Sequence, residues 1–485
     1  MTDFVVRSSD LAALAPEIWL ASAATLLLLL EAFVPKAERA IAWLALAAVG
    51  VASWLVVGLP STSTPFGGLV LGNGLTSAWS QLLLLATAFC LLSSRGYLTR
   101  ERLASGEYEA LLLWCCSGLL LLVRSAELLT LFLALELFSL ALYALAAFHR
   151  RIAWSTESAI KYFLMGAFVS SFVLYGIALV YGQTGTTRLA DIVAVASRGV
   201  ESPALLVLGL LLLVAGFAFK MSLFPFHAWS PDVYQGAPSP FVGFLSVAPK
   251  AASAFVLANL LMTASGTVVA DRWPSLVALL AVCSMVVGNL LALVQRDLKR
   301  MLAYSGIAQM GYAIIPLASL DGRAFWRPLF VYLAAYVLMN SGAFAVITLL
   351  YRRAGEQHSI SELSGWGYRF PLLSACLTVC MLSLAGIPPT AGFLGKYLVF
   401  LHAIEHGQAW LALVGIAASL VGVVYYLRVI YVLFMKEEEC SPEGLPLAFG
   451  GRATAILAAA GTLALGIWPG RLLAWIQSAA GRLTP

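Results

Sequence analysis

The chain has 485 residues, of which 61% are hydrophobic and only 11% are charged. This composition excludes a water-soluble globular protein, because too few polar side chains are available to cover the surface of a molecule of this size. The formal net charge of +5 identifies no partner by itself, and we expect no nucleic-acid partner. The composition therefore predicts an integral membrane protein.

Apolar runs recur along the whole chain. A transmembrane helix needs roughly 20 mostly apolar residues, and about fourteen such runs separated by short polar connectors are present. The first run has no basic leader and no small-residue cleavage site, so we expect an uncleaved span rather than a signal peptide. The predicted spans are 16–34, 40–59, 75–93, 109–123, 127–148, 159–182, 203–226, 239–264, 275–294, 301–319, 326–351, 370–401, 409–434 and 451–478. The fold class predicted is an all-α membrane protein.

Lys and Arg residues are unevenly distributed between the connectors. More of them fall in the loops after odd-numbered spans, as Arg150 and Arg151 do, than in the loops after even-numbered spans. The positive-inside rule then predicts that the odd loops are cytoplasmic. Both termini are therefore expected on the outer face.

Spans 7 and 12 contain prolines that predict interruptions. Pro225 follows Lys220 by five residues and removes a backbone donor from span 7. Span 12 would be about 45 Å long, which exceeds the ~30 Å hydrocarbon thickness. We expect it to break near Pro388 and Pro389. Discontinuous helices at membrane depth are typical of sites that line a wet cavity, although prolines are also simply frequent in membrane helices.

The two interrupted spans are five apart, which suggests two inverted repeats of five helices each. An odd number of helices per repeat makes the second copy face the opposite way. The predicted division is spans 1–3 in residues 1–105, the first repeat (spans 4–8) in 106–265, the inverted second repeat (spans 9–13) in 266–436, and span 14 in 437–485.

Four ionisable residues lie inside these apolar spans, namely Glu136, Lys220, Lys250 and Lys396. A charged side chain at the bilayer centre costs several kcal/mol, so such residues indicate a proton or ion path. Glu136 is near mid-membrane, and Lys220 is its expected partner because opposite charges stabilise each other. Each lysine could instead reach toward the headgroups or form a structural ion pair.

Two further residues are weaker candidates. Glu157 stands four residues before Lys161, a spacing that by itself indicates a surface helical pair. His227 could shuttle protons because an unperturbed imidazole titrates near pH ~6.5, but it could equally be a hydrogen-bonded core residue.

Cofactor motifs are absent from the sequence. The cysteines include no CxxC pair, and the spacing of Cys376 and Cys380 within an apolar span favours core packing over metal binding. No GxGxxG or GxxxxGK motif is present. We therefore expect no metal, iron–sulfur or nucleotide site in this chain.

Three segments resemble signatures of a known family. FKMSLFPFHAWSPDVYQGAPSPFVGFLSVAPK, RDLKRMLAYSGIAQMGY and LSLAGIPPTAGFLGKYLVF are similar to segments of the antiporter-like subunits of proton-pumping NADH:quinone oxidoreductase, or complex I. The resemblance covers spans 4 to 13. Lys396, where a glutamate would indicate another branch, favours the subunit N branch.

The resemblance implies a subunit without a redox centre that carries one proton channel in a bacterial inner membrane. It implies that Glu136 and Lys220 form the coupling pair, that Lys250 is the central relay, that Lys396 faces the exit half-channel, and that Glu157 is a further family acid. FMN, iron–sulfur clusters and quinone would be held by other subunits. The expected partners are neighbouring membrane-arm subunits and the lipid bilayer.

The chain departs from the family at two positions. Gln309 replaces the histidine of the LAYSSIAH motif, and Gly306 replaces its second serine. Glutamine cannot take up a proton, so any relay role there must pass to water or to another side chain. Two other functions remain open: a subunit of an Mrp-type cation/proton antiporter or membrane-bound hydrogenase, and a stand-alone inverted-repeat solute transporter.

Overall fold

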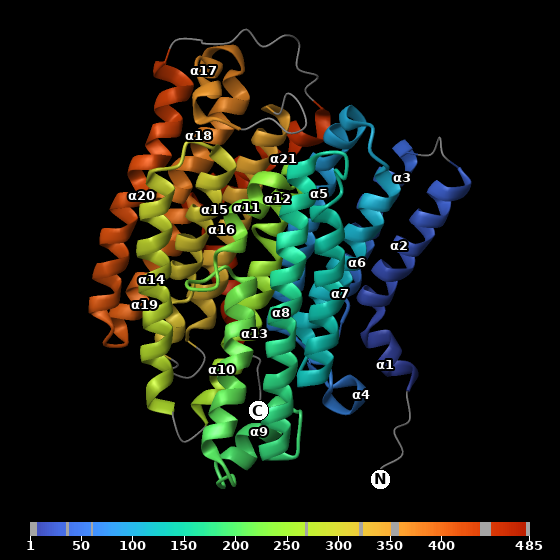
Figure 1. The fold of residues 1–485 in the computed structure, drawn as a ribbon, viewed down its shortest axis with the longest axis vertical. Coiled ribbons are helices and arrows are strands. Elements are labelled where there is room, and N and C mark those ends of the chain that lie inside the picture. Colours follow the sequence, from blue (N-terminus) through green and yellow to red (C-terminus); the bar gives the residue numbers. More distant parts are fainter. Residues whose placement is uncertain are drawn as a thin grey trace.

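The computed structural model describes residues 7–34, 38–59, 62–266, 270–319, 324–350, 358–436 and 448–481. Long helices lie side by side and fill most of the molecule (Figure 1). In the first half of the chain the helices are α1 Ser8–Ala13, α2 Ala15–Phe33, α3 Glu38–Val57, α4 Pro65–Gly68, α5 Gly74–Glu101, α6 Ser105–Arg124, α7 Leu128–Ala146, α8 Ala153–Thr184, α9 Leu189–Ala196, α10 Pro203–Lys220, α11 Trp229–Gly236 and α12 Ser239–Leu245.

The second half continues the same architecture. Its helices are α13 Ala248–Ser265, α14 Trp273–Leu293, α15 Leu298–Ala313, α16 Trp326–Leu350, α17 Trp366–Arg369, α18 Pro371–Ala385, α19 Ala391–Glu405, α20 Ala409–Met435, α21 Phe449–Ile467 and α22 Gly470–Gly481. Short 3₁₀ helices are η1 Ala270–Arg272, η2 Ile315–Ala318 and η3 Ile360–Leu363. The strands β1 Thr62–Ser63 and β2 Gly72–Asn73 pair in an antiparallel ladder.

The predicted all-α membrane architecture is confirmed. Among the described residues, 13 helices are long and apolar enough to cross a membrane. The predicted twelfth span consists of two shorter helices, α18 and α19, which are separated at the expected Pro388 and Pro389. The predicted interruption of span 7 is also present, since α10 ends at Lys220 and α11 begins only at Trp229.

Span 8 has the predicted position, since Ser239–Ser265 is long and apolar enough to cross a membrane, but it contains a break that was not predicted, and span 14 was predicted too long. Span 8 is divided into α12 and α13 at Val247. Pro249 would break a helix that continued through it. In the first turn of α13, where Pro249 lies, its missing amide hydrogen costs little. Span 14 ends at Ile467, because Pro469 disfavours a helical conformation at Trp468, and α22 follows as a separate helix.

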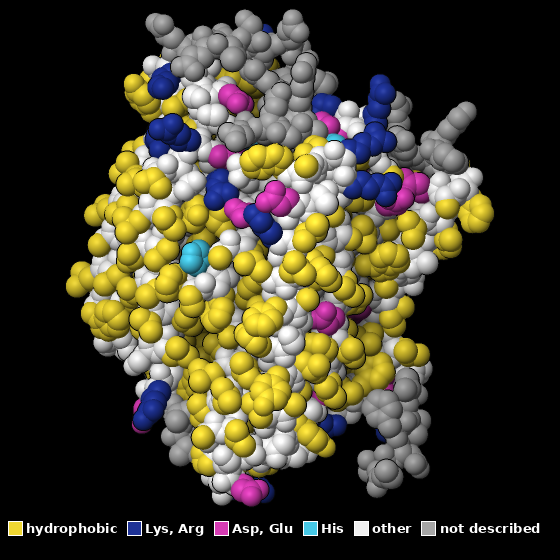
Figure 2. Space-filling view, viewed as in Figure 1, with side chains coloured by type: hydrophobic (Ala, Val, Ile, Leu, Met, Phe, Trp, Pro, Cys, Tyr) yellow, Lys and Arg dark blue, Asp and Glu magenta, His cyan; other side chains and the backbone are white. Residues whose placement is uncertain are grey.

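The central helix of the bundle is α16, which packs against α5, α12, α18, α19 and α21. The outer helices α7, α8 and α20 instead carry large exposed apolar side chains such as Leu133, Phe168 and Leu420. On the face shown in Figure 2, hydrophobic side chains cover the middle, and most charged side chains lie toward the upper and lower ends. This distribution is the one that a bilayer requires of its protein surface.

Helices α8 and α10 approach each other at Gly176 and Gly209. A Cβ atom on Gly209 would lie 2.9 Å from the carbonyl oxygen of Gly176. Small residues of this kind let membrane helices pack through their backbones. This contact fixes α10, and with it Lys220, against its neighbours.

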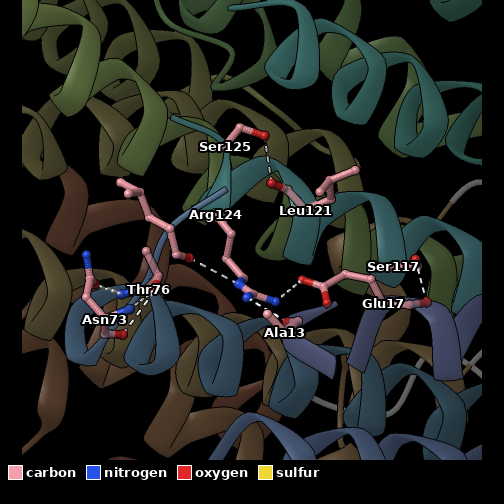
Figure 3. A network of polar contacts seen from close by, with 9 residues as sticks. Ala13, Glu17, Asn73, Thr76, Ser117, Leu121, Arg124 and Ser125 are labelled. Atoms are coloured by element: carbon pink, nitrogen blue, oxygen red, sulfur yellow. Dashed lines mark hydrogen bonds and ion pairs between the residues drawn. The ribbon is translucent and has the colours of Figure 1, made fainter. Parts of the chain in front are cut away.

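A buried ion pair fastens the N-terminal helices to the bundle (Figure 3). Arg124, at the end of α6, donates to the Glu17 carboxylate of α2 at 2.6 Å. Its guanidinium also donates to the carbonyl oxygens of Ala13 (2.8 Å) and Leu71 (3.2 Å). Ser117 donates to the Glu17 carbonyl. These bonds compensate for the burial of both charges.

Candidate functional site

Lys220 is the last residue of α10, and its side chain is buried against α7. Its ammonium donates to Ser139 Oγ at 2.8 Å and to the Tyr143 hydroxyl at 3.4 Å. The ring centroid of Phe138 lies 5.5 Å from Nζ. A buried ammonium needs such partners, since an uncompensated charge in an apolar medium is strongly unfavourable.

Glu136 lies on α7, three residues before Ser139, and therefore on the same helix face. Its charge acts on Lys220 through space, while the hydrogen bonds of the ammonium go to hydroxyl groups. One oxygen, Oε1, is buried and accepts no hydrogen bond from a described residue. The charges of Glu136 and Lys220 therefore interact through space, and the two side chains do not form a contact ion pair.

Lys250 lies in the first turn of α13, directly after the break at Val247, and is fully buried. Its Nζ donates to no described residue and lies 5.5 Å from the ring centroid of Tyr234. On α15, a Cβ atom at Gly306 would lie 3.1 Å from Nζ and 3.0 Å from the Tyr336 hydroxyl. Gly306 therefore leaves space between the lysine and the tyrosine.

Lys396 lies on α19, after the break in span 12, and is buried. Its ammonium donates to the carbonyl oxygens of Leu384 (3.1 Å) and Ala385 (3.0 Å) and to Ser419 Oγ (2.7 Å). These carbonyl oxygens are available because α18 ends at Ala385 and leaves its last acceptors without helical partners. The helix break thus builds the binding site for the lysine.

Gln309 lies on α15 and is fully engaged in hydrogen bonds. Its Nε2 donates to the Leu384 carbonyl and to the Tyr426 hydroxyl, both at 3.0 Å. Its Oε1 accepts from the Tyr332 hydroxyl, and Tyr426 is also bonded to Ser305. Polar side chains therefore extend from Ser305, one residue before Gly306, to the carbonyl oxygen that Lys396 uses.

The two weaker candidates lie apart from these lysines. Glu157 pairs with Lys161 at 2.9 Å on the partly exposed surface of α8, the helical pair that its spacing indicates. Lys161 also forms a salt bridge with Asp232 at 3.1 Å, and Asp232 forms another with Arg300 at 2.7 Å. His227 lies in the turn after α10 and stacks on Phe224, with ring centroids 5.4 Å apart.

Several residues of the site were not found from the sequence. Ser139, Tyr143 and Tyr426 are uncharged and common in membrane helices, so nothing in the pattern marked them. Two further buried charged residues, for which no contact with these lysines is seen, were also missed. Glu109 is fully buried in α6, and neither carboxylate oxygen accepts a hydrogen bond from a described residue. Glu109 was missed because it is the first residue of predicted span 4, where a charged residue is expected at the membrane surface. Lys299 is also buried and donates to the Ala237 carbonyl at 2.8 Å.

Metal-ligating side chains are not grouped in the described part of the chain. No cluster of three or more His, Cys, Asp or Glu residues there could hold a metal ion. Cys376 and Cys380 are buried free thiols in α18, as expected for core packing. Cys440 lies outside the described residues.

The family described as NADH:quinone oxidoreductase/Mrp antiporter, TM, matches residues 125–422. The chain belongs to this family. The matched segment includes every lysine of the candidate site.

Relatives within the NADH:quinone oxidoreductase/Mrp antiporter family are similar over nearly their whole length. NADH-quinone oxidoreductase subunit N of Trichlorobacter lovleyi is 40% identical over 98% of this chain and 97% of its own length. The protein of the same name from Salinibacter ruber is 40% identical over 90% of this chain and 87% of its own.

Chains in three solved structures have a similar fold. A chain of respiratory complex I from Thermus thermophilus, solved with bound aureothin, is 34% identical, with a TM-score of 0.78 over 95% of this chain and 98% of that one. A chain of an archaeal membrane-bound sulfane sulfur reductase is 24% identical, with a TM-score of 0.87 over 97% of each chain. A chain of the Mrp complex from Dietzia is 19% identical, with a TM-score of 0.81 over 97% of each. The last two show the fold alone.

Proposed function

We propose that this chain is a proton-translocating subunit, of the subunit N type, in the membrane arm of a respiratory NADH:quinone oxidoreductase. The observation that carries the proposal is the near-full-length similarity to subunit N relatives at 40% identity. The similarity of 34% to a chain of complex I supports it further. Its partners are then other membrane-arm subunits and the bilayer.

In this function the buried lysines carry protons. A buried lysine can exchange between neutral and charged forms, which is the requirement for a relay. Lys220 would exchange protons with the surroundings of Glu136 through the Ser139 hydroxyl, which lies 2.8 Å from its ammonium. Lys250 would be the central station, and Lys396 the last one before the exit.

Gln309 determines how protons could pass between Lys250 and Lys396. An amide neither gains nor loses a proton near neutral pH, so Gln309 cannot be a station. It holds Tyr332 and Tyr426 in place through its hydrogen bonds. Protons would then pass along hydroxyl groups and water, with Gln309 as a positioning residue. Glu157 and His227 stay lower-ranked members of the relay.

The finer features of the proposal follow from the same likeness. The chain would hold no redox centre or cofactor, and FMN, iron–sulfur clusters and quinone would belong to other subunits. It would span a bacterial inner membrane with both termini on the periplasmic face. Spans 4–8 and 9–13 would be inverted repeats, which the breaks five spans apart in α10–α11 and α18–α19 support.

A subunit of an Mrp-type antiporter is the second candidate, and the shared fold favours it. The identity to the Mrp chain is only 19%, against 34% to the complex I chain. Co-purification in mild detergent separates the two functions. We expect flavin-containing and iron–sulfur polypeptides to accompany the chain, with NADH-driven proton uptake into reconstituted vesicles. Isolation with antiporter subunits alone, without flavin, would contradict the proposal.

A further inference from the structure

A cavity of about 890 Å³ lies where α3 begins, α5 ends and α21 begins. This is the upper end of the molecule in Figure 1. Its lining includes the apolar side chains of Leu46, Leu91 and Leu92 and, nearer the C-terminal end of α5, Arg95 and Arg100. Leu91 and Arg100 are nine residues apart, a separation of about 14 Å along α5. The lining is therefore basic toward the C-terminal end of α5 and apolar toward the middle of that helix.

Arg95 is the cation that this cavity presents. Its guanidinium lies over the indole of Trp43, 5.6 Å from the ring centroid. It makes no hydrogen bond or salt bridge with another described residue, although Glu109 acts on it through space. Arg100, by contrast, pairs with Glu101 at 3.7 Å and donates to the Thr348 carbonyl. A partly buried guanidinium in an apolar helix favours an anionic partner.

The backbone packing around the cavity is set by two glycines. A Cβ atom at Gly96 would collide with Ala448, and one at Gly450 would collide with the Leu92 carbonyl. The end of α5 and the start of α21 therefore pack closely at these residues, which line the cavity.

We infer that this cavity binds one anionic phospholipid, with its phosphate on Arg95 and an acyl chain along the leucines. Arginine matches the geometry of a phosphate through paired N–H donors. Trp43 and Phe449 line the cavity and are exposed, as aromatic residues at the headgroup level of a bilayer are. The apolar part of the lining selects a lipid over free phosphate, because a soluble anion would leave the leucine walls uncovered.

Lipid retention by the assembled complex tests this inference. The purified complex is placed in nanodiscs of equal parts phosphatidylglycerol and phosphatidylcholine, returned to detergent, and its retained lipid is measured by native mass spectrometry. We expect Arg95→Gln to lower the retained ratio of phosphatidylglycerol to phosphatidylcholine about fivefold, the effect of one arginine at a membrane surface. Arg452→Gln is the matched control, since Arg452 is exposed on α21 and does not line the cavity.

A photo-crosslinking residue in place of Leu46 provides a second measurement that does not depend on Arg95. We expect an adduct with phosphatidylglycerol that inorganic phosphate does not compete away. An adduct with a polypeptide of the complex would show that a neighbouring subunit fills the cavity and would overturn the inference. Equal phosphatidylglycerol retention by the wild type and Arg95→Gln would also overturn it.

Discussion

Gln309 and Lys396 donate hydrogen bonds to the same acceptor, the carbonyl oxygen of Leu384. The two side chains come from α15 and α19. The shared carbonyl lies in the last turn of α18, where it has no donor from its own helix. We therefore expect a change at Gln309 to affect Lys396 through this shared acceptor. This relationship connects the sequence departure at Gln309 to the last lysine of the relay.

Replacement of Gln309 tests that connection. Gln309→Leu removes the bonds to Leu384, Tyr426 and Tyr332, and each buried polar group left unpaired costs about 1–3 kcal/mol. We expect NADH-driven proton pumping to fall at least about fivefold in reconstituted vesicles. Gln309→His is the control, because an imidazole can replace some of the same bonds, and it should pump at close to the wild-type rate. Equal pumping by the leucine variant would show that Gln309 positions nothing.

The space at Gly306 gives a second prediction. A Cβ atom there would lie 3.1 Å from the Lys250 ammonium, so Gly306→Val should displace the lysine and depress quinone-linked NADH oxidation. Gly306→Ser should keep most activity, because its hydroxyl can bond Lys250 in compensation. The measurement is NADH oxidation with added quinone in membranes with matched complex content. A valine variant as active as the serine variant would contradict the assigned geometry.

The Ser139 hydroxyl accepts the shorter of the two hydrogen bonds of the Lys220 ammonium, which predicts that removing the two acceptor hydroxyls has unequal effects. Ser139→Ala removes the 2.8 Å bond of the Lys220 ammonium, whereas Tyr143→Phe removes the 3.4 Å one. A bond to a charged group is worth about 1.5–3 kcal/mol. We expect Ser139→Ala to slow pumping about tenfold and Tyr143→Phe to slow it less. The reverse order of the two rates would contradict the role given to Ser139.

The buried pair of Arg124 and Glu17 gives a prediction about stability. Arg124→Leu leaves the Glu17 charge buried without its 2.6 Å partner, which should cost about 3–5 kcal/mol of folding free energy. The loss should appear as a lower unfolding temperature of the detergent-solubilised protein. Arg124→Leu combined with Glu17→Leu should recover most of it, because no charge is then left alone. A double variant no more stable than the single one would contradict this explanation.

The sequence predicted the parts of this protein that charge and proline determine. The apolar composition of the spans makes three charged residues conspicuous, namely Lys220, Lys250 and Lys396. Pro388 marks the helix break that leaves the Leu384 carbonyl without a helical donor. The break in span 8 was missed because Pro249 lies near a helix start, where proline is tolerated. Ser139, Tyr426 and the cavity at Arg95 were also missed, since each depends on contacts between helices distant in the chain. Such contacts produce no periodic pattern in the local sequence from which they could be predicted.

The proton-to-electron ratio of a Lys250→Met complex in sealed vesicles tests the central claim most directly, because methionine keeps the apolar bulk of the side chain and cannot hold a proton. The ratio is measured together with NADH oxidation and complex content, so that loss of assembly is distinguished from loss of transfer. The account predicts an assembled complex with a lower ratio or with blocked quinone-linked oxidation. An assembled complex with the wild-type ratio and the wild-type rate would contradict it.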